Sequence, residues 1–253
     1  IPGSRIAQFL GIFRGVRRQT ATAREVISRL PMPTEYSKIV VDGPGKHRTK
    51  RAEICNLEVG QVLVQVAFAG VSQAALRTMC LRPEHGAGFP MVPGREYSGI
   101  MIGSLNGAGN PRTGWKVAGL RTAGCGDCPA CDAGDPHWCS NRNRSGSDGA
   151  YTGALALTPS EVHRLPMRMS RKQGASVGTA ARCLDGLYRL GVEKGRSACV
   201  VGAGPVGNLC AQILQRKGVH VTVVDSQIRW LGHLFKYDVN TLSELGELRT
   251  FDY

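Results

Sequence analysis

SACVVGAGPVGNLCAQILQRKGVHVTVVD, residues 197 to 225, is the stretch of sequence that decides the fold. The apolar run ACVV comes first, a glycine-rich turn follows it, and the next segment carries Leu209, Ile213 and Leu214. A second apolar run then ends at Asp225. This order predicts strand, turn, helix and strand, which is the βαβ unit of a parallel sheet.

The turn of this unit has the pattern GxGxxG. Gly202 would allow the tight turn, Gly204 would let the backbone approach a pyrophosphate, and Gly207 would let the helix pack on the strand. The N-terminus of the helix supplies a site for the anion. We therefore predict a dinucleotide site, whose candidate residues are Gly202, Gly204, Pro205, Val206, Gly207, Asp225 and Arg229.

Asp225 decides which dinucleotide is expected. It follows Gly207 by 18 residues (225 − 207), where a carboxylate can accept hydrogen bonds from the ribose hydroxyls of the adenosine. A 2′-phosphate would meet like charge there, which favours NAD, whereas Arg229 would soften that repulsion and keeps NADP as the alternative. A second interpretation also stays open, in which an ordinary glycine turn precedes an Asp225 that caps a helix or forms an ion pair.

Four cysteines gather in CGDCPACDAGDPHWC, at positions Cys125, Cys128, Cys131 and Cys139. Thiolates at this spacing can converge on one tetrahedral ion, so we expect one zinc per chain. Four protein ligands leave no open coordination position, and such a zinc would therefore be structural. An iron–sulfur cluster and paired disulfides are the alternatives.

Composition narrows the class of protein. The chain has 253 residues, 42% of them hydrophobic, and no uninterrupted apolar run of about 18 residues, so we expect a globular protein without a membrane span. The net charge is +13, but the basic residues are scattered and not interleaved with aromatics, which argues against direct nucleic-acid binding. The five other cysteines lack framework spacing, which favours buried thiols in the cytoplasm; they are Cys55, Cys80, Cys183, Cys199 and Cys210.

Three regions are expected along the chain. Residues 1–35 form a basic extension, interpreted as an organellar transit peptide, a membrane-surface helix or the result of processing. Residues 36–166 are β-rich, with the cysteine lobe at about 123–142, and their expected strands are YSKIVV, QVLVQVAFAG, YSGIMIGSL, WKVAGL and YTGALAL. Residues 167–253 form a second domain, which opens with a Ser170–Gln173 capping box and a helix to about Leu190.

Several of these segments, in this order, resemble the medium-chain dehydrogenase/reductase family, the zinc alcohol dehydrogenases and their relatives. The segments are AGVSQAAL (69–76), FPMVPGREYSGIM (89–101), the cysteine lobe, DGAYTGALAL (148–157) and VVGAGPVG (200–207). The resemblance implies a GroES-like catalytic domain followed by an incomplete α/β Rossmann domain. It also implies a homo-oligomer when the chain is full length, and hydride transfer between a nicotinamide cofactor and a small-molecule carbonyl, alcohol or activated double bond.

The same resemblance marks where this chain departs from the family. The catalytic zinc there typically binds a Cys in an AGVC motif, a His in a GHE motif and a further Cys or acid downstream, whereas this chain has Ser72, Arg95 and ASVGTAA (175–181). Only the acid of the second motif remains, as Glu96. A serine hydroxyl is a poor zinc ligand and a guanidinium repels the ion, so we predict a site without catalytic zinc.

The candidate catalytic residues are therefore Arg95, Glu96 and Ser72. Arg95 would replace the zinc as electrophile, with Glu96 holding it in place, unless the two form only a structural ion pair. Two further alternatives are a zinc enzyme that uses Glu96 or His85 as a substitute ligand, and a non-catalytic chain that binds a nucleotide or a partner. The chain ends at Tyr253, about where a third Rossmann strand is expected, so activity of this chain alone stays an open question.

Overall fold

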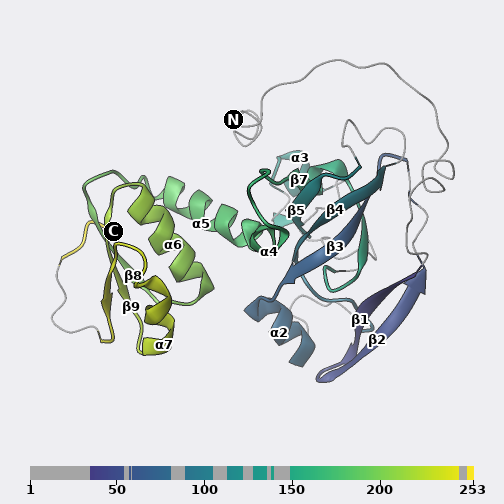
Figure 1. Ribbon diagram of the computed structural model, residues 1–253, viewed down its shortest axis with the longest axis horizontal. Coiled ribbons are helices and arrows are strands. Elements are labelled where there is room, and N and C mark those ends of the chain that lie inside the picture. The colour runs from purple at the N-terminus through teal and green to yellow at the C-terminus, as the bar shows by residue number, and fades with distance from the viewer. Residues whose placement is uncertain are drawn as a thin grey trace, which may run out of the picture.

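The computed structural model describes residues 35–53, 57, 59–80, 89–104, 113–121, 128–135, 138–139, 149–244 and 250–253. Within these ranges the chain forms two lobes, one built on an antiparallel sheet and the other on a parallel sheet (Figure 1). No helix in the described ranges is long and apolar enough to cross a membrane. The predictions for residues 1–34 lie outside the described residues.

The first lobe is built on a five-stranded sheet of order β6-β3-β4-β5-β7. Its strands are β3 (Val62–Gly70), β4 (Glu96–Ser104), β5 (Lys116–Leu120), β6 (Ala154–Leu157) and β7 (His163–Arg164), and all neighbouring pairs are antiparallel. The buried side chains between them include Val62, Val64, Tyr97, Met101, Val117, Leu155 and Leu157. Most of these strands have apolar residues on both faces, so each appears in the sequence as a short segment rich in apolar residues.

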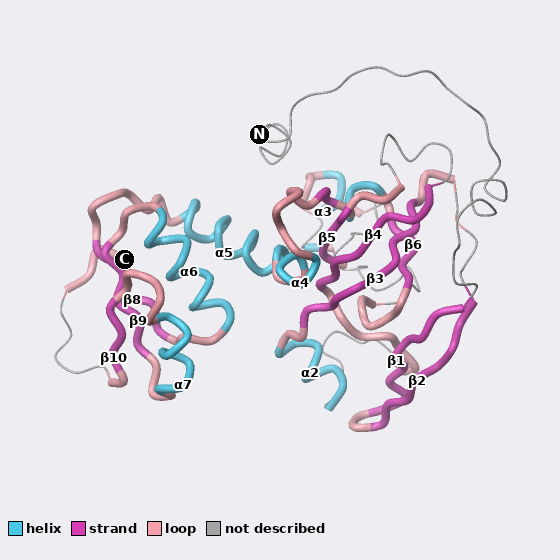
Figure 2. Tube along the Cα trace, in the orientation of Figure 1, coloured by secondary structure: helices cyan, strands magenta, loops and turns pink. Residues whose placement is uncertain are grey.

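A separate hairpin, β1 (Glu35–Gly43) and β2 (Lys46–Glu53), flanks this sheet (Figure 2). The apolar strand β1 is predicted from the sequence, but β2 is not, because seven of its eight residues are exposed and it carries no apolar alternation. The hairpin is tied to the lobe by backbone hydrogen bonds between Val41 and Met91, 2.8 and 3.0 Å long. Tertiary pairing therefore determines β2 where local sequence does not.

The segment after Pro166 remains attached to the antiparallel sheet. Lys116 Nζ donates to the carbonyl oxygens of Met167 and Met169 at 2.6 and 2.8 Å, and the hydroxyl of buried Ser98 donates to the Arg171 carbonyl. The helix α4 (Arg171–Gly174) follows, and its capping box at Ser170 confirms that part of the prediction. The domain boundary predicted after Pro166 stays a prediction.

The helix predicted to run to Leu190 is divided into α4 and α5 (Val177–Arg189). The division follows from packing. A side chain at Gly174 would lie 2.5 Å from Leu165, and one at Gly178 would lie 2.5 Å from Leu120, so both positions sit directly against the first lobe. The helix α5 contacts β4 and β5 of that lobe and also α6 of the second (Figure 1).

The second lobe has the predicted βαβ unit, with β8 (Ser197–Val201), α6 (Pro205–Arg216) and β9 (His220–Val224). The two strands are parallel, and α6 packs on both of them. A short α7 (Ile228–Leu231) and one 3-10 turn lead to β10 (Asn240–Leu242), which pairs in parallel with β9. The buried core between sheet and helices consists of Ala198, Ala203, Ala211, Leu214, Val219, Val221, Val223, Leu231 and Leu234.

The end of the chain corrects one prediction. The third parallel strand is β10, whereas the sequence places it at about residue 251. Residues 252 and 253 instead lie along the other edge of β8, where Asp252 N–H donates to Ser197 O at 3.2 Å and Cys199 N–H donates to Tyr253 O at 3.0 Å. The short helix α7 made the compact connection to β10 difficult to foresee, because four residues carry little periodicity.

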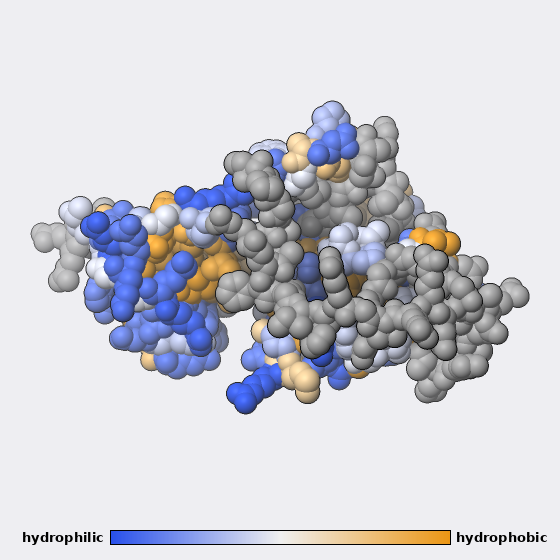
Figure 3. Space-filling model, turned by 90° about the horizontal axis from the view of Figure 1, so that it is seen from above, coloured by the Kyte–Doolittle hydropathy of each residue, from blue (hydrophilic) through white to orange (hydrophobic). Residues whose placement is uncertain are grey.

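Apolar surface remains exposed on the second lobe, which lies on the left in Figure 3. Its exposed large apolar side chains are Leu184, Tyr188, Leu190, Val201, Val206, Ile228, Phe235 and Leu242. Val201 and Val206 flank the glycine turn between β8 and α6. An apolar surface therefore lies next to the predicted dinucleotide site.

Candidate cofactor and substrate site

The glycine turn between β8 and α6 has the geometry that its sequence predicts. Gly202 has a φ of 98°, a left-handed conformation that favours glycine. A side chain at Gly207 would lie 1.8 Å from the Gly202 carbonyl oxygen, so only glycine permits this contact of helix with turn. Nothing lies within 4 Å of a side chain built on Gly204, which leaves the backbone there accessible to a ligand.

The position of the turn in the sheet also suits a ligand. The turn follows β8. One edge of β8 pairs with β9 and the other edge bonds to residues 252–253, so the chain that follows β8 continues first on one side of this strand and later on the other. Ligands of open α/β sheets bind at such a switch point, beyond the carboxyl ends of the strands. The structure thus places the glycine turn and the N-terminus of α6 together at that edge.

Asp225 at the end of β9 is a partner of the turn itself. Its carboxylate oxygens accept the Ala203 and Gln227 N–H groups, both at 2.7 Å. The Ala203 amide, then the Gln227 amide and the charge of Arg229 hold the pKa of Asp225 below its usual range. Each carboxylate oxygen has further acceptor capacity, so these bonds orient the group without preventing a contact with ribose hydroxyls.

In the first lobe, the carboxylate of Glu96 is the centre of a polar cluster. Glu96 is buried at the start of β4, and its side chain is 7% exposed. The Thr179 hydroxyl donates to Glu96 Oε1, and Arg182 Nη2 donates to the same oxygen at 3.0 Å. Both partners lie on α5, one helical turn apart, so the cluster joins the two lobes.

The sequence predicts Arg95 as the partner of Glu96, but the hydrogen bonds of the Glu96 carboxylate go to Thr179 and Arg182. Arg95 is exposed just before β4, and its carbonyl oxygen accepts the Arg121 N–H at 2.6 Å. Thr179 and Arg182 are not among the predicted site residues; they lie in or next to ASVGTAA, the stretch that stands in place of the third zinc ligand. Their spacing of three residues, on one face of a helix, was the signal.

Ser72 follows the end of β3, where Gly70 pairs with Glu96, but it has a local role. Its hydroxyl accepts the Ala75 N–H at 3.2 Å, and its carbonyl accepts the Leu76 N–H at 3.0 Å, at the start of α2 (Gln73–Cys80). Gly70, two residues earlier, pairs with Glu96, and a side chain there would lie 2.9 Å from Glu96 Oε2 and from the Ala175 carbonyl oxygen. Gly70 therefore allows β3, β4 and the C-terminal end of α4 to meet.

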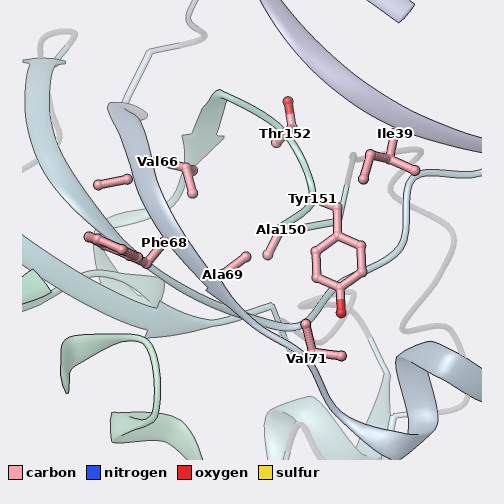
Figure 4. Close-up of a pocket in the computed structure, with 9 residues that line it drawn as sticks. Ile39, Val66, Phe68, Ala69, Val71, Ala150, Tyr151 and Thr152 are labelled. Atoms are coloured by element: carbon pink, nitrogen blue, oxygen red, sulfur yellow. The ribbon is translucent and has the colours of Figure 1, made fainter. Parts of the chain in front are cut away.

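A hollow of about 340 Å³ opens beside the end of β3 (Figure 4). Apolar groups dominate its lining, which consists of Ile39, Val66, Ala67, Phe68, Ala69, Val71, Ala150, Tyr151 and Thr152. The Tyr151 hydroxyl donates to the Gly70 carbonyl at 3.3 Å. Burial and then the charge of Glu96 raise the pKa of Tyr151, so this hydroxyl stays neutral and connects the hollow to the Glu96 cluster.

Tyr97, the residue after Glu96, belongs to the core. It is fully buried, and its hydroxyl donates to the Glu161 carbonyl at 2.7 Å. Burial raises the pKa of Tyr97 far above its usual range. Neighbouring strand residues point to opposite faces, so only Glu96 of this pair faces α5.

The described part of the cysteine lobe brings three thiols together. The Sγ atoms of Cys128, Cys131 and Cys139 all lie within 4.8 Å of one another, and the first two are 3.6 Å apart. Tetrahedral zinc with Zn–S bonds of about 2.3 Å requires sulfur atoms about 3.8 Å apart. These three thiols therefore fit one zinc ion, whereas Cys125, the fourth predicted ligand, lies outside the described residues.

The cysteines outside the lobe correct a smaller prediction. Cys183 is buried, Cys199 and Cys210 are half-buried, and Cys80 is exposed at the end of α2. None of these four forms a disulfide. The expectation of buried thiols is thus wrong for Cys80, because the short helix α2 lies at the surface of the lobe.

Comparison with known proteins agrees with this two-lobe arrangement. The alcohol dehydrogenase GroES-like domain matches residues 58–167, and an FAD binding domain matches residues 196–233. The 2-dehydro-3-deoxy-L-galactonate 5-dehydrogenase of Pseudoalteromonas atlantica is 28% identical over 66% of this chain and 49% of its own length. The sorbitol dehydrogenase of Halalkalibacterium halodurans is 26% identical over 82% of this chain and 54% of its own.

Solved structures share the fold at lower identity. An Escherichia coli alcohol dehydrogenase complexed with NADH has a TM-score of 0.72 and 20% identity, and covers 83% of this chain and 63% of its own. A putative zinc-binding dehydrogenase of Sinorhizobium meliloti bound to NADP has a TM-score of 0.73 and 20% identity, over 83% and 61%. The chain spans about half the length of the curated relatives it matches. Residues 58–167 belong to the alcohol dehydrogenase GroES-like domain family, and the two lobes in this order are similar to those of zinc alcohol dehydrogenase-like medium-chain dehydrogenases/reductases.

Proposed function

We propose that this chain is the substrate-binding and cofactor-binding part of an NAD(P)-dependent oxidoreductase. The observation that carries the proposal is the glycine turn, where Gly202 adopts a positive φ and Gly207 touches the Gly202 carbonyl at the N-terminus of α6. A nicotinamide cofactor supplies the hydride that passes to or from a carbonyl, alcohol or activated double bond. The named dehydrogenases among the relatives support this class of reaction.

The residues of the turn fit a dinucleotide. The open backbone at Gly204 and the start of α6 would hold the pyrophosphate, and the carboxylate of Asp225 would accept the ribose hydroxyls. Because the pKa of Asp225 is lowered, the group is an anion at neutral pH and would repel a 2′-phosphate. NAD is therefore the proposed cofactor, with NADP as the alternative that Arg229 favours.

Binding of NADH tests this proposal directly. NADH fluorescence is titrated with the chain, and NADPH is titrated in parallel. We expect saturable binding of NADH, and weaker binding of NADPH that becomes tighter in an Asp225→Ser variant. If the folded chain binds neither nucleotide, the proposed function is wrong.

We also propose that the catalytic centre contains no zinc and that the cysteine lobe holds one structural zinc. Ser72 and Arg95 occupy positions where the family typically has a thiolate and an imidazole, and Glu96 already has Thr179 and Arg182 as partners. Metal analysis of the purified chain should give one zinc, bound by Cys125, Cys128, Cys131 and Cys139. Two zinc ions per chain would contradict this proposal and favour substitute ligands.

Arg95 stays a candidate electrophile, because an exposed guanidinium at this position could hydrogen-bond a substrate oxygen. Turnover by an Arg95→Ala variant decides its role. A loss of turnover with unchanged NADH affinity would support a catalytic function, whereas unchanged turnover would assign Arg95 to the surface. A small-molecule substrate, homo-oligomerisation and a cytoplasmic location remain predictions from the sequence.

A further inference from the structure

Arg182 is a cation fixed in place by the buried Glu96 carboxylate. Its Nη2 donates to Glu96 Oε1 at 3.0 Å and to Thr179 Oγ1 at 3.3 Å. A guanidinium has five N–H groups, and the three on Nε and Nη1 meet no acceptor in the described part of the chain. The side chain is 56% exposed, so these groups are open to a ligand.

The helix that carries Arg182 contacts both the Glu96 cluster and the dinucleotide turn. On one side, Thr179 and Arg182 bind Glu96 of β4. On the other side, the thiol of the next residue, Cys183, donates to the Val206 carbonyl in the first turn of α6 at 3.7 Å. Arg182 is thus held at the junction of the two lobes, which Figure 1 shows at α5.

The chemistry of the free N–H groups selects an oxygen ligand with negative charge. Guanidinium offers donors only and keeps its charge at every physiological pH. A carboxylate can accept two parallel hydrogen bonds from a guanidinium and also carries the opposite charge, which a neutral oxygen does not. The pair with Glu96 uses only Nη2, so it leaves the N–H groups on Nε and Nη1 available for a second acceptor.

We propose that Arg182 binds a carboxylate oxygen of the substrate, so that the substrates are hydroxy acids or oxo acids. This inference rests on the proposed function. It names the substrate class of the same site, with Glu96 and Thr179 as the residues that position the guanidinium.

The test compares benzoate with benzyl alcohol, which share a ring and differ in charge. Proton line broadening of each compound measures its affinity for the full chain and needs no cofactor. We expect benzoate to bind at least about tenfold more tightly than benzyl alcohol, and to lose that advantage in Arg182→Met. Arg182→Lys should retain part of it. Arg189→Met is the control, because Arg189 is 72% exposed on the same helix and pairs with Asp185.

Removing Arg182 alone leaves a buried carboxylate with one partner fewer and could impair folding. The double variant Glu96→Gln with Arg182→Met removes both charges and should fold while losing benzoate binding. Equal benzoate affinity in wild type and in either Arg182→Met protein overturns the inference.

Inorganic phosphate and NADH distinguish the source of the anion. If Arg182→Met lowers NADH affinity about tenfold and leaves benzoate affinity unchanged, the guanidinium binds a cofactor phosphate, and the substrate assignment is wrong. Phosphate should compete with NADH in that case. Wild-type chain that binds benzoate through Arg182 but does not bind NADH would refute the proposed function and leave the carboxylate site intact.

Discussion

Single residues show where sequence reasoning succeeds and where it fails. The glycines of the turn were predictable because backbone geometry fixes them: Gly202 has a positive φ, and Gly207 has no room for a side chain. The partners of Glu96 were not predictable, because Thr179 and Arg182 come from a helix more than 80 residues away. Local motifs carry the first kind of information, whereas the second depends on tertiary packing.

Gly207→Ala should abolish the dinucleotide turn. The new methyl group would lie 1.8 Å from the Gly202 carbonyl oxygen, so the helix must move away from the turn. We expect NADH affinity to fall at least about tenfold, as measured by fluorescence titration. Gly186→Ala is the matched control, because nothing lies within 4 Å of that position on α5, and it should raise the free energy of unfolding by about 0.5–1 kcal/mol. Equal NADH affinity in both variants would contradict the packing argument.

Arg121 and Glu161 form an ion pair in which both side chains are largely buried. Arg121 Nη1 and Glu161 Oε1 are 2.5 Å apart, and the side chains are 10% and 7% exposed. Arg121→Ala leaves the buried carboxylate of Glu161 with only its hydrogen bonds to Thr158. Urea unfolding should show a free energy of unfolding that is lower by about 3 kcal/mol. Arg189→Ala, at an exposed pair, should change it by less than about 0.5 kcal/mol. A small effect at both positions would show that Glu161 is solvated in solution.

A strand or helix can be predicted from the sequence when its own residues carry the hydrophobic pattern of that element. The strands β3, β4 and β5 are rich in apolar residues and are predicted to within a few residues, whereas exposed β2 is not. The capping box at Ser170 marked a helix start, but the break at Ala175 and Ser176 arises from contacts of Gly174 with Leu165. Helix ends set by long-range contact leave no local signal.

The cysteine lobe allows a prediction at the scale of one element. Its three described thiols are arranged for tetrahedral zinc, so the metal should organise the segment around α3 (Pro129–Asp132). Cys128→Ser should lower the zinc content, measured by elemental analysis, from one per chain to well below one. Limited proteolysis should then cleave within residues 122–148.

Cys80→Ser is the control for this experiment, because Cys80 is exposed on α2, away from the thiol cluster. It should keep one zinc per chain and the wild-type proteolysis pattern. An iron content equal to the chain concentration, or a zinc content unaffected by Cys128→Ser, would contradict the structural-zinc interpretation.

At the scale of the molecule, the order of two lobes was predictable because each has its own periodicity. The antiparallel strands precede the βαβ unit in the sequence and in the structure. The contact between lobes was not predictable, since α5 joins them through Glu96 on one side and Val206 on the other. The extent of the parallel sheet was also underestimated, because β10 is only three residues long.

Acid should affect the parallel-sheet lobe through two carboxylates. Hydrogen bonds from Ala203 and Gln227 lower the pKa of Asp225, and those from the backbone and side chain of Ser197 lower the pKa of Asp252. A group whose folded pKa is lowered contributes stability above its unfolded pKa of about 3.9, and this stability is lost as the pH falls through the folded value. Asp225 holds the glycine turn and Asp252 holds the end of the chain on β8, so both losses fall on the same lobe.

We therefore expect the urea concentration at the unfolding midpoint of the parallel-sheet lobe to decrease as the pH is lowered from 5 to 3. Hydrogen exchange in residues 197–224 monitors the unfolding of this lobe. The double variant Asp225→Asn with Asp252→Asn should begin less stable at pH 6 and depend less on pH, because neither amide titrates. Asp42→Asn is the control, since Asp42 has a lowered pKa through Arg48 but lies in the hairpin of the other lobe. If the double variant lost stability with pH as steeply as the wild type, the acid sensitivity would have to arise elsewhere, and Asp225 would not be the group that fixes the cofactor turn.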